Sequence, residues 1–279
     1  MSRWSPESLQ VALFPARVIA TKIESGWRTR VIDKRVVETA DVKPVAADAG
    51  TPDAAASAAN PPWKATVAAL DEVLAGFTSP GIPATIIISN RFVRYVIVPW
   101  RDNVIGAPEQ AEFARHCFTN VYGEAAKDWE IRISSGGFRR KALASAVDAQ
   151  MLREVERIVK ERGFPIVSIQ PNFMAACNRF RRELNGHGSG CVAVLEPGRV
   201  ALGIYDRSGW HTLSARRIET PKPEELVSVL AQELKSVDPQ GLPEYLFVAA
   251  VGPTTSSFFR TRTKAWMLPA QTRIPDSLP

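Results

Sequence analysis

The stretch VAVLEPGRVALGIYD, residues 192–206, reads as two apolar strands that meet at Pro197-Gly198. A strand–turn–strand unit of this shape holds phosphate groups when backbone N–H groups of its turn face the ligand and a carboxylate stands beside them. Here Glu196 precedes the turn, whereas Pro197 has no N–H to donate. The stretch therefore raises the question whether this turn binds a ligand or has only the shape of a binding turn.

A second stretch near the N-terminus has the same pattern. LQVALFPARVIATKI, residues 9–23, contains two β-rich runs that meet at Pro15-Ala16. A further strand is predicted after each pair, at about 28–39 and at 210–218. The sequence therefore predicts two β-meanders in two related halves, each with a mixed sheet and helices packed on it.

The remaining segments supply helices, strands and loops. Residues 43–62 are rich in Ala, Pro, Asp and Ser and predict a disordered loop. Asp148 and Asn172 are predicted to cap the helices that follow them, and 185–190 reads as a hinge. Apolar periodicity predicts helices at 62–75, 109–122, 149–162, 172–184 and 223–235, a strand pair at 84–100 around Ser89-Asn90-Arg91, and strands at 129–134, 142–148, 165–171 and 244–255.

Composition narrows the class of protein. The 279 residues carry a formal net charge of +6, and 45% of them are hydrophobic, as in a globular protein with a buried core. Three widely spaced cysteines predict neither a disulfide framework nor a zinc site, and a reducing compartment is the simpler interpretation. No run of about 18 apolar residues occurs, so no membrane span is predicted. The basic clusters are scattered without interleaved aromatic residues, which favours a solvated surface over nucleic-acid binding.

The order of elements resembles that of the actin-like ATPase superfamily, and more closely PilM of type IV pilus assembly and the GspL cytoplasmic domain of type II secretion. TIIISNRFVRYVIVPW resembles their strand pair before an inserted subdomain, and EQAEFARHCFTNVYG resembles the helix of that insert. LASAVDAQMLREVERIVKERGFPIVSIQPNFMAACNRF resembles their strand–helix–strand return. The resemblance covers nearly the whole chain after residue 8, apart from 43–62.

The resemblance implies an α/β, two-lobed actin-like (ribonuclease H-like) fold with degenerate phosphate turns. The first lobe is expected at residues 1–185, with the disordered loop 43–62 and an inserted βαβ-type subdomain at about 84–148. The second lobe is expected at residues 186–279.

The residues depart from the superfamily pattern at the phosphate turns. Active members carry Asp-x-Gly there, whereas Phe14-Pro15-Ala16-Arg17 has neither a carboxylate nor a glycine. At the second turn Gly198 is present and Glu196 can replace the Asp as a metal ligand, the alternative being a solvated turn residue. Hydrolysis is therefore not expected, because phosphoryl transfer needs several aligned charges.

The chain is thus predicted not to be an enzyme and to have no resident metal, while residual binding of ATP and Mg²⁺ stays open. Arg17 and Arg199 are expected to face each other across the cleft and to bind an anion or a partner's carboxylate, the alternative being two surface arginines. The candidate nucleotide-binding residues are Pro15, Ala16, Arg17, Glu196, Gly198, Arg199 and Gly252.

The resemblance implies a scaffold at the cytoplasmic face of the inner membrane, in a type IV pilus or type II secretion platform. Its expected partners are a membrane-anchored, PilN-like assembly protein and the assembly motor ATPase, with a homodimer also possible and no nucleic acid. An edge strand in 84–134 can accept a partner segment by β-augmentation. The candidate partner-binding residues are Asn90, Arg91, Arg94, Trp100 and Phe113. The alternatives are an active actin-like ATPase or small-molecule kinase, and a nucleic-acid-binding protein.

Overall fold

The structure is a computed structural model. It describes residues 7–26, 30–39, 61–104, 106–134, 137–186, 188–218, 245–251 and 256–262. For Ala250, Val251 and residues 256–262 it describes the backbone alone. Most of the predicted loop at 43–62, the predicted helix at 223–235 and Gly252 lie outside the described residues.

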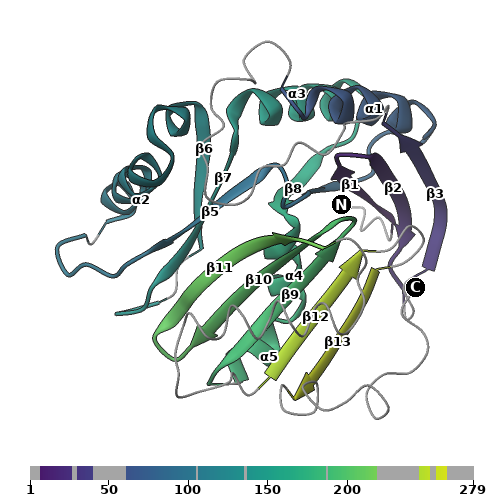
Figure 1. Ribbon diagram of the computed structural model, residues 1–279. Helices are drawn as coiled ribbons and strands as arrows, with labels where there is room; N and C mark the ends of the chain where they lie inside the picture. Colours follow the sequence, from purple (N-terminus) through teal and green to yellow (C-terminus); the bar gives the residue numbers. More distant parts are fainter. Residues whose placement is uncertain are drawn as a thin grey trace, which may run out of the picture.

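The first lobe is built on a five-stranded sheet with β1 at its centre (Figure 1). Its strands are β1 (Glu7–Phe14), β2 (Arg17–Glu24), β3 (Arg30–Glu38), β4 (Ala84–Ile88) and β8 (Ile166–Pro171), in the order β3-β2-β1-β4-β8. The first three form the predicted antiparallel meander, whereas β4 pairs in parallel with both β1 and β8.

The second sheet repeats this arrangement. Its strands are β9 (Gly190–Glu196), β10 (Arg199–Asp206), β11 (Gly209–Arg217), β12 (Tyr245–Val251) and β13 (Ser256–Arg262), in the order β11-β10-β9-β12-β13. As in the first sheet, a meander is followed by a strand parallel to the first strand of that meander. Only the last strand differs, because β13 runs antiparallel to β12 while β8 runs parallel to β4. The predicted two-lobed α/β fold with two related halves is confirmed.

Between β4 and β8 the chain forms a smaller subdomain, the insert, at residues 93–148. It contains β5 (Val93–Val98), α2 (Ala107–Tyr122), the 3₁₀ helix η1 (Gly123–Asp128), β6 (Trp129–Ser134) and β7 (Ala142–Asp148). The strand order is β5-β7-β6, with both outer strands antiparallel to β7, so β5–α2–β6 is a βαβ unit whose two strands flank β7.

The two strands predicted at 84–100 do not pair with each other. β4 lies in the first sheet between β1 and β8, and β5 lies at the edge of the insert's sheet. The reason is burial, since Ala84, Ile86 and Ile88 alternate along β4 and are at most 1% exposed in the core of the first lobe. The insert's sheet therefore begins at Val93 and not at 84.

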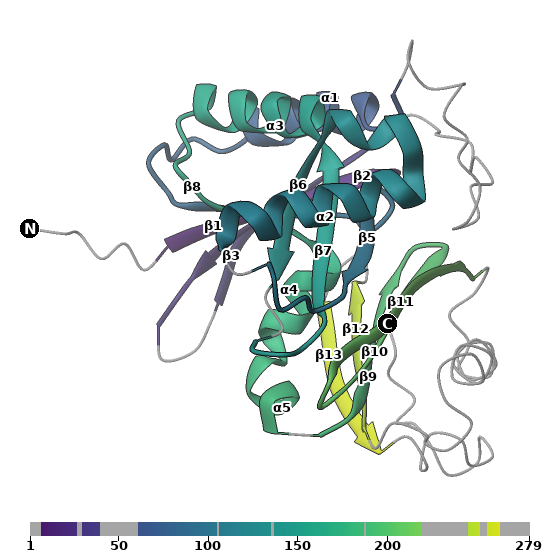
Figure 2. The ribbon, with the colours of Figure 1, turned by 90° about the vertical axis from the view of Figure 1, so that its left-hand side faces the viewer.

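Two long helices cover one face of the first sheet. α1 (Lys64–Ala75) and α3 (Ala149–Glu161) lie side by side above it, as Figures 1 and 2 show. Asp148 caps α3 as predicted, since its Oδ1 accepts hydrogen bonds from the backbone N–H groups of Gln150 and Met151. Its Oδ2 also accepts a hydrogen bond from Trp63 Nε1 at 3.2 Å, which joins the starts of the two helices.

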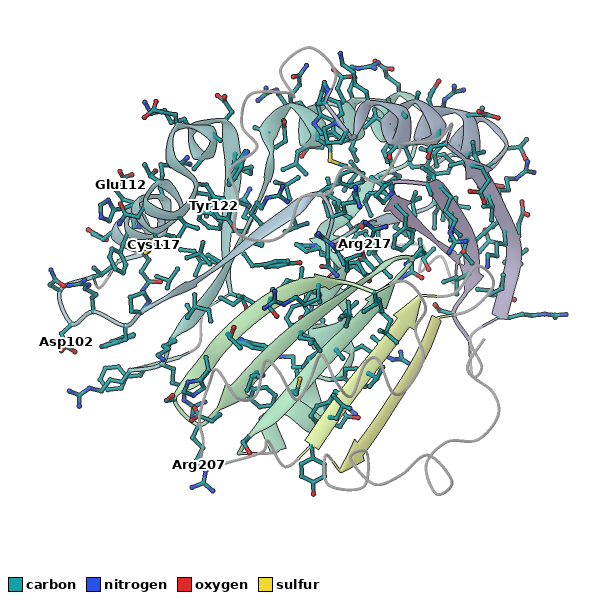
Figure 3. The ribbon with its side chains drawn as sticks, in the orientation of Figure 1. Asp102, Glu112, Cys117, Tyr122, Arg207 and Arg217 are labelled. Atoms are coloured by element: carbon teal, nitrogen blue, oxygen red, sulfur yellow. The ribbon has the colours of Figure 1, made fainter. Side chains whose placement is uncertain are left out.

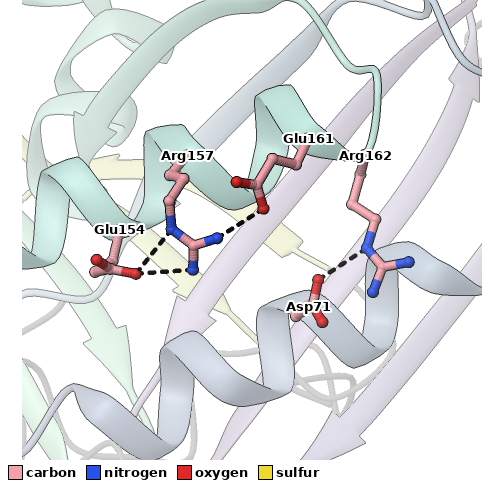
Figure 4. A network of polar contacts seen from close by, with 5 residues as sticks. All are labelled: Asp71, Glu154, Arg157, Glu161 and Arg162. Carbon is pink, nitrogen blue, oxygen red and sulfur yellow. Dashed lines mark hydrogen bonds and ion pairs between the residues drawn. The ribbon is translucent and has the colours of Figure 1, made fainter.

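Surface ion pairs follow the seam between these helices (Figure 4). Arg157 of α3 pairs with Glu154 and Glu161, and Arg162 reaches across to Asp71 of α1 at 2.8 Å. The Arg162 hydrogen bond lowers the pKa of Asp71. All five side chains are substantially exposed, so these pairs add little to stability beside the apolar core beneath them.

Two short helices, α4 (Asn172–Arg179) and α5 (Arg181–Gly186), connect the lobes. α4 packs on the second sheet through Phe173, Ala176 and Cys177. Gly203 of β10 allows this close approach, because a Cβ placed there would lie 2.5 Å from Phe173 Cζ and 2.7 Å from Trp210 Cζ3.

We expect Gly203→Ala to lower the free energy of unfolding by about 1–3 kcal/mol, because the added methyl group overpacks the contact between α4 and β10. Urea denaturation followed by circular dichroism measures this change. Gly186→Ala is the matched control, since among the described residues no atom outside its own helix and chain neighbours lies within 4 Å of its Cβ position, and it should change stability by less than about 0.5 kcal/mol. Equal effects from the two substitutions would contradict the packing argument.

Candidate functional site

The two predicted corners are tight two-residue turns. Pro15-Ala16 joins β1 to β2, and Pro197-Gly198 joins β9 to β10. Gly198 has φ +73°, a conformation that only glycine adopts without strain, so its presence is explained by the turn itself. Ala16 has no such backbone conformation.

Both corners carry the same backbone contact. The N–H of Thr39, just after β3, donates to the carbonyl of Ala16 at 2.9 Å, and the N–H of Ile218, just after β11, donates to the carbonyl of Gly198 at 3.2 Å. The Thr39 hydroxyl also donates to the carbonyl of Pro15. Each proline removes one amide donor, so neither corner offers a phosphate a full set of N–H groups.

The carboxyl group of Glu196 lies inside the protein beside the second corner. The residue is only 7% exposed, and its two oxygens accept three hydrogen bonds. Oε2 accepts from Ser89 Oγ at 2.6 Å, while Oε1 accepts from the backbone N–H of Asn90 at 3.0 Å and from Asn172 Nδ2 at 2.7 Å. Glu196 is therefore not a solvated turn residue, and its oxygens are already engaged by donors of the first lobe and α4.

Asn90 extends these contacts into a larger group, which we call the Glu196 cluster (Ser89, Asn90, Tyr95, Asn172 and Glu196). The Oδ1 atom of Asn90 accepts hydrogen bonds from Tyr95 Oη at 2.7 Å and from the N–H of Phe173 at 3.0 Å. The cluster thus joins the β4–β5 connection, the start of α4 and the end of β9.

Burial governs the electrostatics of the cluster. It raises the pKa of Glu196 above the usual 4.5, while the hydrogen bonds from Ser89, Asn90 and Asn172 and the charge of Arg199 act in the opposite direction. Burial and the nearby Glu196 also raise the pKa of Tyr95. The hydroxyl of Tyr95 is therefore a neutral hydrogen-bond donor at physiological pH.

Arginines gather beside this cluster. Burial and, to a smaller extent, the charges of Arg217 and Arg94 lower the pKa of Arg91. Figure 3 shows Arg217 near the middle of the molecule, where β11 reaches the first lobe. The charge at this junction is positive, as an anion-binding surface requires.

Comparison with solved structures identifies the fold. The chain is similar to the cytoplasmic domain of EpsL, an inner membrane component of the type II secretion system of Vibrio cholerae, with 16% identity and a TM-score of 0.54 over 88% of this chain and 83% of that one. It is also similar to a Bacteroides thetaiotaomicron protein with actin-like ATPase fold, with 10% identity and a TM-score of 0.51 over 85% of this chain and 80% of that one. This chain has the actin-like ATPase fold.

A third similar structure is the PilM-PilN type IV pilus biogenesis complex, with 13% identity and a TM-score of 0.50 over 83% of this chain and 66% of that one. No protein-family model and no curated protein matches the sequence. The resemblance that the sequence predicted is thus confirmed at the level of the actin-like ATPase fold.

Within the actin-like ATPase fold, the predicted nucleotide-binding residues occupy two separate corners. Pro15, Ala16 and Arg17 lie at the first, and Glu196, Gly198 and Arg199 lie at the second. Arg17 acts on the pKa of Lys34, and Arg199 acts on that of Glu196. That the two arginines face each other stays a prediction. Gly252 lies outside the described residues, and that part of the prediction stays untested.

The predicted partner-binding residues divide into an inner and an outer group. Asn90 is 2% exposed and belongs to the Glu196 cluster, so it does not reach the surface, and Arg91 is half-buried. Arg94 Nη1 donates to the carbonyls of Arg91 and Val93 at the base of the insert. Trp100 and Phe113 lie at the far end of β5 and on α2.

The outer group forms a surface of aromatic rings and arginines at the tip of the insert, the tip surface (Trp100, Arg101, Phe113, Phe138 and Arg139). The Trp100 and Phe138 rings meet edge to face with centroids 5.3 Å apart, and Phe138 is 80% exposed. The guanidinium of Arg101 lies over Phe113 at 5.3 Å, and that of Arg139 lies over Phe138 at 5.9 Å.

The described part of the chain contains no group of three or more His, Cys, Asp or Glu side chains that could hold a metal ion. Sequence reasoning missed three members of the Glu196 cluster: Ser89, Tyr95 and Asn172. Asn172 was expected to cap α4, but the cap position is Pro171, and the Asn172 amide donates to Glu196 instead. A polar Ser-Asn pair directly after an apolar strand was the available signal of a buried polar group.

We expect Glu196→Ala to lower the free energy of unfolding by about 3–5 kcal/mol, because it leaves three buried donors without an acceptor. Glu196→Gln keeps an oxygen for Asn90 and Asn172, so its loss should stay below about 2 kcal/mol. Thermal and urea unfolding measure both. Equal, small losses would show that the cluster contributes little to stability.

A comparison of the wild type with Glu196→Gln also predicts how the free energy of unfolding changes with pH. Because the pKa of Glu196 is raised in the folded state, the unfolded chain loses this proton first as the pH rises above about 4.5. The stability of the wild type should therefore fall relative to Glu196→Gln with rising pH, until Glu196 ionises in the folded state as well. A difference that is constant with pH would contradict the raised pKa.

Proposed function

We propose that this chain is a non-catalytic scaffold of an inner-membrane assembly platform related to type II secretion or type IV pilus systems. It binds a membrane-anchored partner and works at the cytoplasmic face of the membrane, where the assembly motor ATPase also docks. The observation that best supports a non-catalytic role is that the carboxyl group of Glu196 already accepts hydrogen bonds from three protein donors.

The chemistry of both corners supports the non-catalytic part of this proposal. Phosphoryl transfer depends on metal ions and aligned polar groups around the phosphates. The first corner carries no carboxylate, and the second has its carboxyl group turned into the protein. Releasing Glu196 toward a metal ion would break the contacts that hold β9 to the first lobe.

The similar structures support the platform part. EpsL is described as an inner membrane component of a type II secretion system, and PilM-PilN is a type IV pilus biogenesis complex. No helix in the part of the chain that the structure describes is long and apolar enough to cross a bilayer. The net charge of +6 suits contact with an anionic inner leaflet.

The tip surface is the best candidate for partner contact. Binding hot spots are enriched in Trp, Tyr and Arg, and an exposed aromatic ring flanked by guanidinium groups has this composition. Phe138 is 80% exposed, and the β6–β7 connection that carries it lies beside the end of the β10–β11 hairpin (Figure 1). The outer edges of β5 and β6 lie beside the tip surface and can take up an extended segment by strand addition.

We expect the protein with ATP and Mg²⁺ to release phosphate no faster than buffer alone, because the groups that catalyse hydrolysis are missing or engaged. A coupled phosphate-release assay over several hours measures this. Glu196→Gln is the control for a contaminating ATPase, which this substitution leaves unaffected. Turnover by the wild type that Glu196→Gln abolishes would overturn the scaffold proposal in favour of an active ATPase.

We expect the pair Trp100→Ser and Phe138→Ser to weaken binding of the partner's cytoplasmic N-terminal peptide at least about tenfold, since it removes the aromatic surface. Fluorescence anisotropy with a labelled peptide from the membrane-anchored assembly protein of the same organism measures this affinity. Val167→Ser, which changes a 68% exposed valine on β8, is the matched control and should leave the affinity unchanged.

A second arm tests the inner group of residues. Arg91→Ser combined with Arg94→Ser alters the base of the insert and leaves the tip surface in place. If this variant loses binding while the tip variant keeps it, the partner segment lies at the base of the insert. Unchanged affinity in both variants would remove the insert as the partner site.

A further inference from the structure

A cavity of about 940 Å³ opens at the end of the second sheet that lies away from the Pro197-Gly198 corner. Three parts of the chain line it: the insert through Ser134 and Arg140, α4 and α5 through residues such as Cys177 and Arg181, and the β10–β11 hairpin. Its size lies in the usual range of small-molecule sites, roughly 300–1,000 Å³.

The parts that surround the cavity are in direct contact with each other. The N–H of Lys141, next to Arg140, donates to the carbonyl of Ser208 at 3.0 Å, and Lys141 forms an isolated bridge with Gly209. A Cβ at Gly209 would lie 2.6 Å from the carbonyl oxygen of Lys141, so the backbones approach closely. The cavity is therefore a built feature of the junction between the insert and the second lobe.

One wall of the cavity is apolar and aromatic. Met174 and Cys177 line it from α4, and Tyr205 and Trp210 line it from the hairpin. The two rings meet edge to face with their centroids 5.5 Å apart. This wall can receive the aromatic or aliphatic body of a ligand.

The hydroxyl of Tyr205 is a buried polar group that no atom of the described residues satisfies. Tyr205 is 8% exposed, and its hydroxyl has no hydrogen-bond partner within the described residues. Burial raises the pKa of Tyr205, so the hydroxyl keeps its proton. Tyr205 therefore lines the cavity with its ring and not with its hydroxyl, which lies against Gly190 of β9.

The rim of the cavity is positively charged. Arg140, Arg181 and Arg207 come from three different elements, and Figure 3 shows Arg207 at the outer end of the β10–β11 hairpin. None of the three forms an ion pair with another described residue. The carboxylate in the lining, Asp206, is engaged by His211 at 2.8 Å and by Ser208.

We propose that this cavity binds a small organic anion, with phosphate or carboxylate groups at the arginine rim and an aromatic or aliphatic body against Tyr205 and Trp210. Guanidinium groups pair with both kinds of anion through two parallel hydrogen bonds. The site lies away from both corners of the lobes and borders the tip surface, because Arg140 follows Arg139 in the chain. The proposal does not rest on the proposed scaffold function.

The experiment compares three probes on the full chain by isothermal titration calorimetry: phenyl phosphate, inorganic phosphate and benzyl alcohol. Because phenyl phosphate fills both the apolar wall and the rim, it should bind at least about tenfold more tightly than either of the other two. Phthalate in place of phenyl phosphate distinguishes a carboxylate ligand from a phosphate ligand. Equal affinity for phenyl phosphate and inorganic phosphate would overturn the proposal.

Variants locate the binding. Arg181→Gln and Arg207→Gln should each weaken phenyl phosphate about three- to tenfold, whereas Arg153→Gln, an exposed arginine on α3, should change nothing. If all of these variants bind phenyl phosphate equally, the anion is held by the general positive charge of the surface, and the cavity is not its site.

Discussion

The carboxyl group of Glu196 is the contact on which the relation between the two lobes depends. A buried carboxyl group is costly unless donors surround it, and here the donors come from the β4–β5 connection and from the start of α4. Each donor in turn loses its partner if Glu196 is removed. Glu196 thus bonds the end of β9 to the first lobe and to the connecting helix at once.

The two lobes share a backbone plan but differ in chemistry at the same position. Each has a meander, a proline in its first corner and a backbone hydrogen bond from the residue after the third strand to the corner. The first corner is preceded by Phe14, which is 2% exposed, and the second is preceded by Glu196. One corner thus contributes to an apolar core and the other to a polar junction, so each turn has a structural role in its lobe.

Local patterns in the sequence predicted much of this fold. Apolar alternation located the strands of both meanders, and Asp148 was correctly predicted to cap α3, because such features depend on residues close together in the chain. The hydrogen-bond partners of Asn172 and Glu196 were not predictable in the same way. The Glu196 side chain meets Ser89, Asn90 and Asn172 from segments distant in sequence. The residues next to Asn172 do not distinguish a helix-capping side chain from a buried donor.

The separation of Ser89 from Glu196, 107 residues along the chain, also has a consequence for biosynthesis. All five strands of the first sheet lie before residue 172, so that sheet can form while the second lobe is still being made. Ser89, Asn90 and Asn172 acquire their acceptor only when β9 is complete. Folding of the nascent chain should therefore include a stage in which the first sheet is ordered while its junction is still hydrated, and the arrival of one glutamate ends that stage.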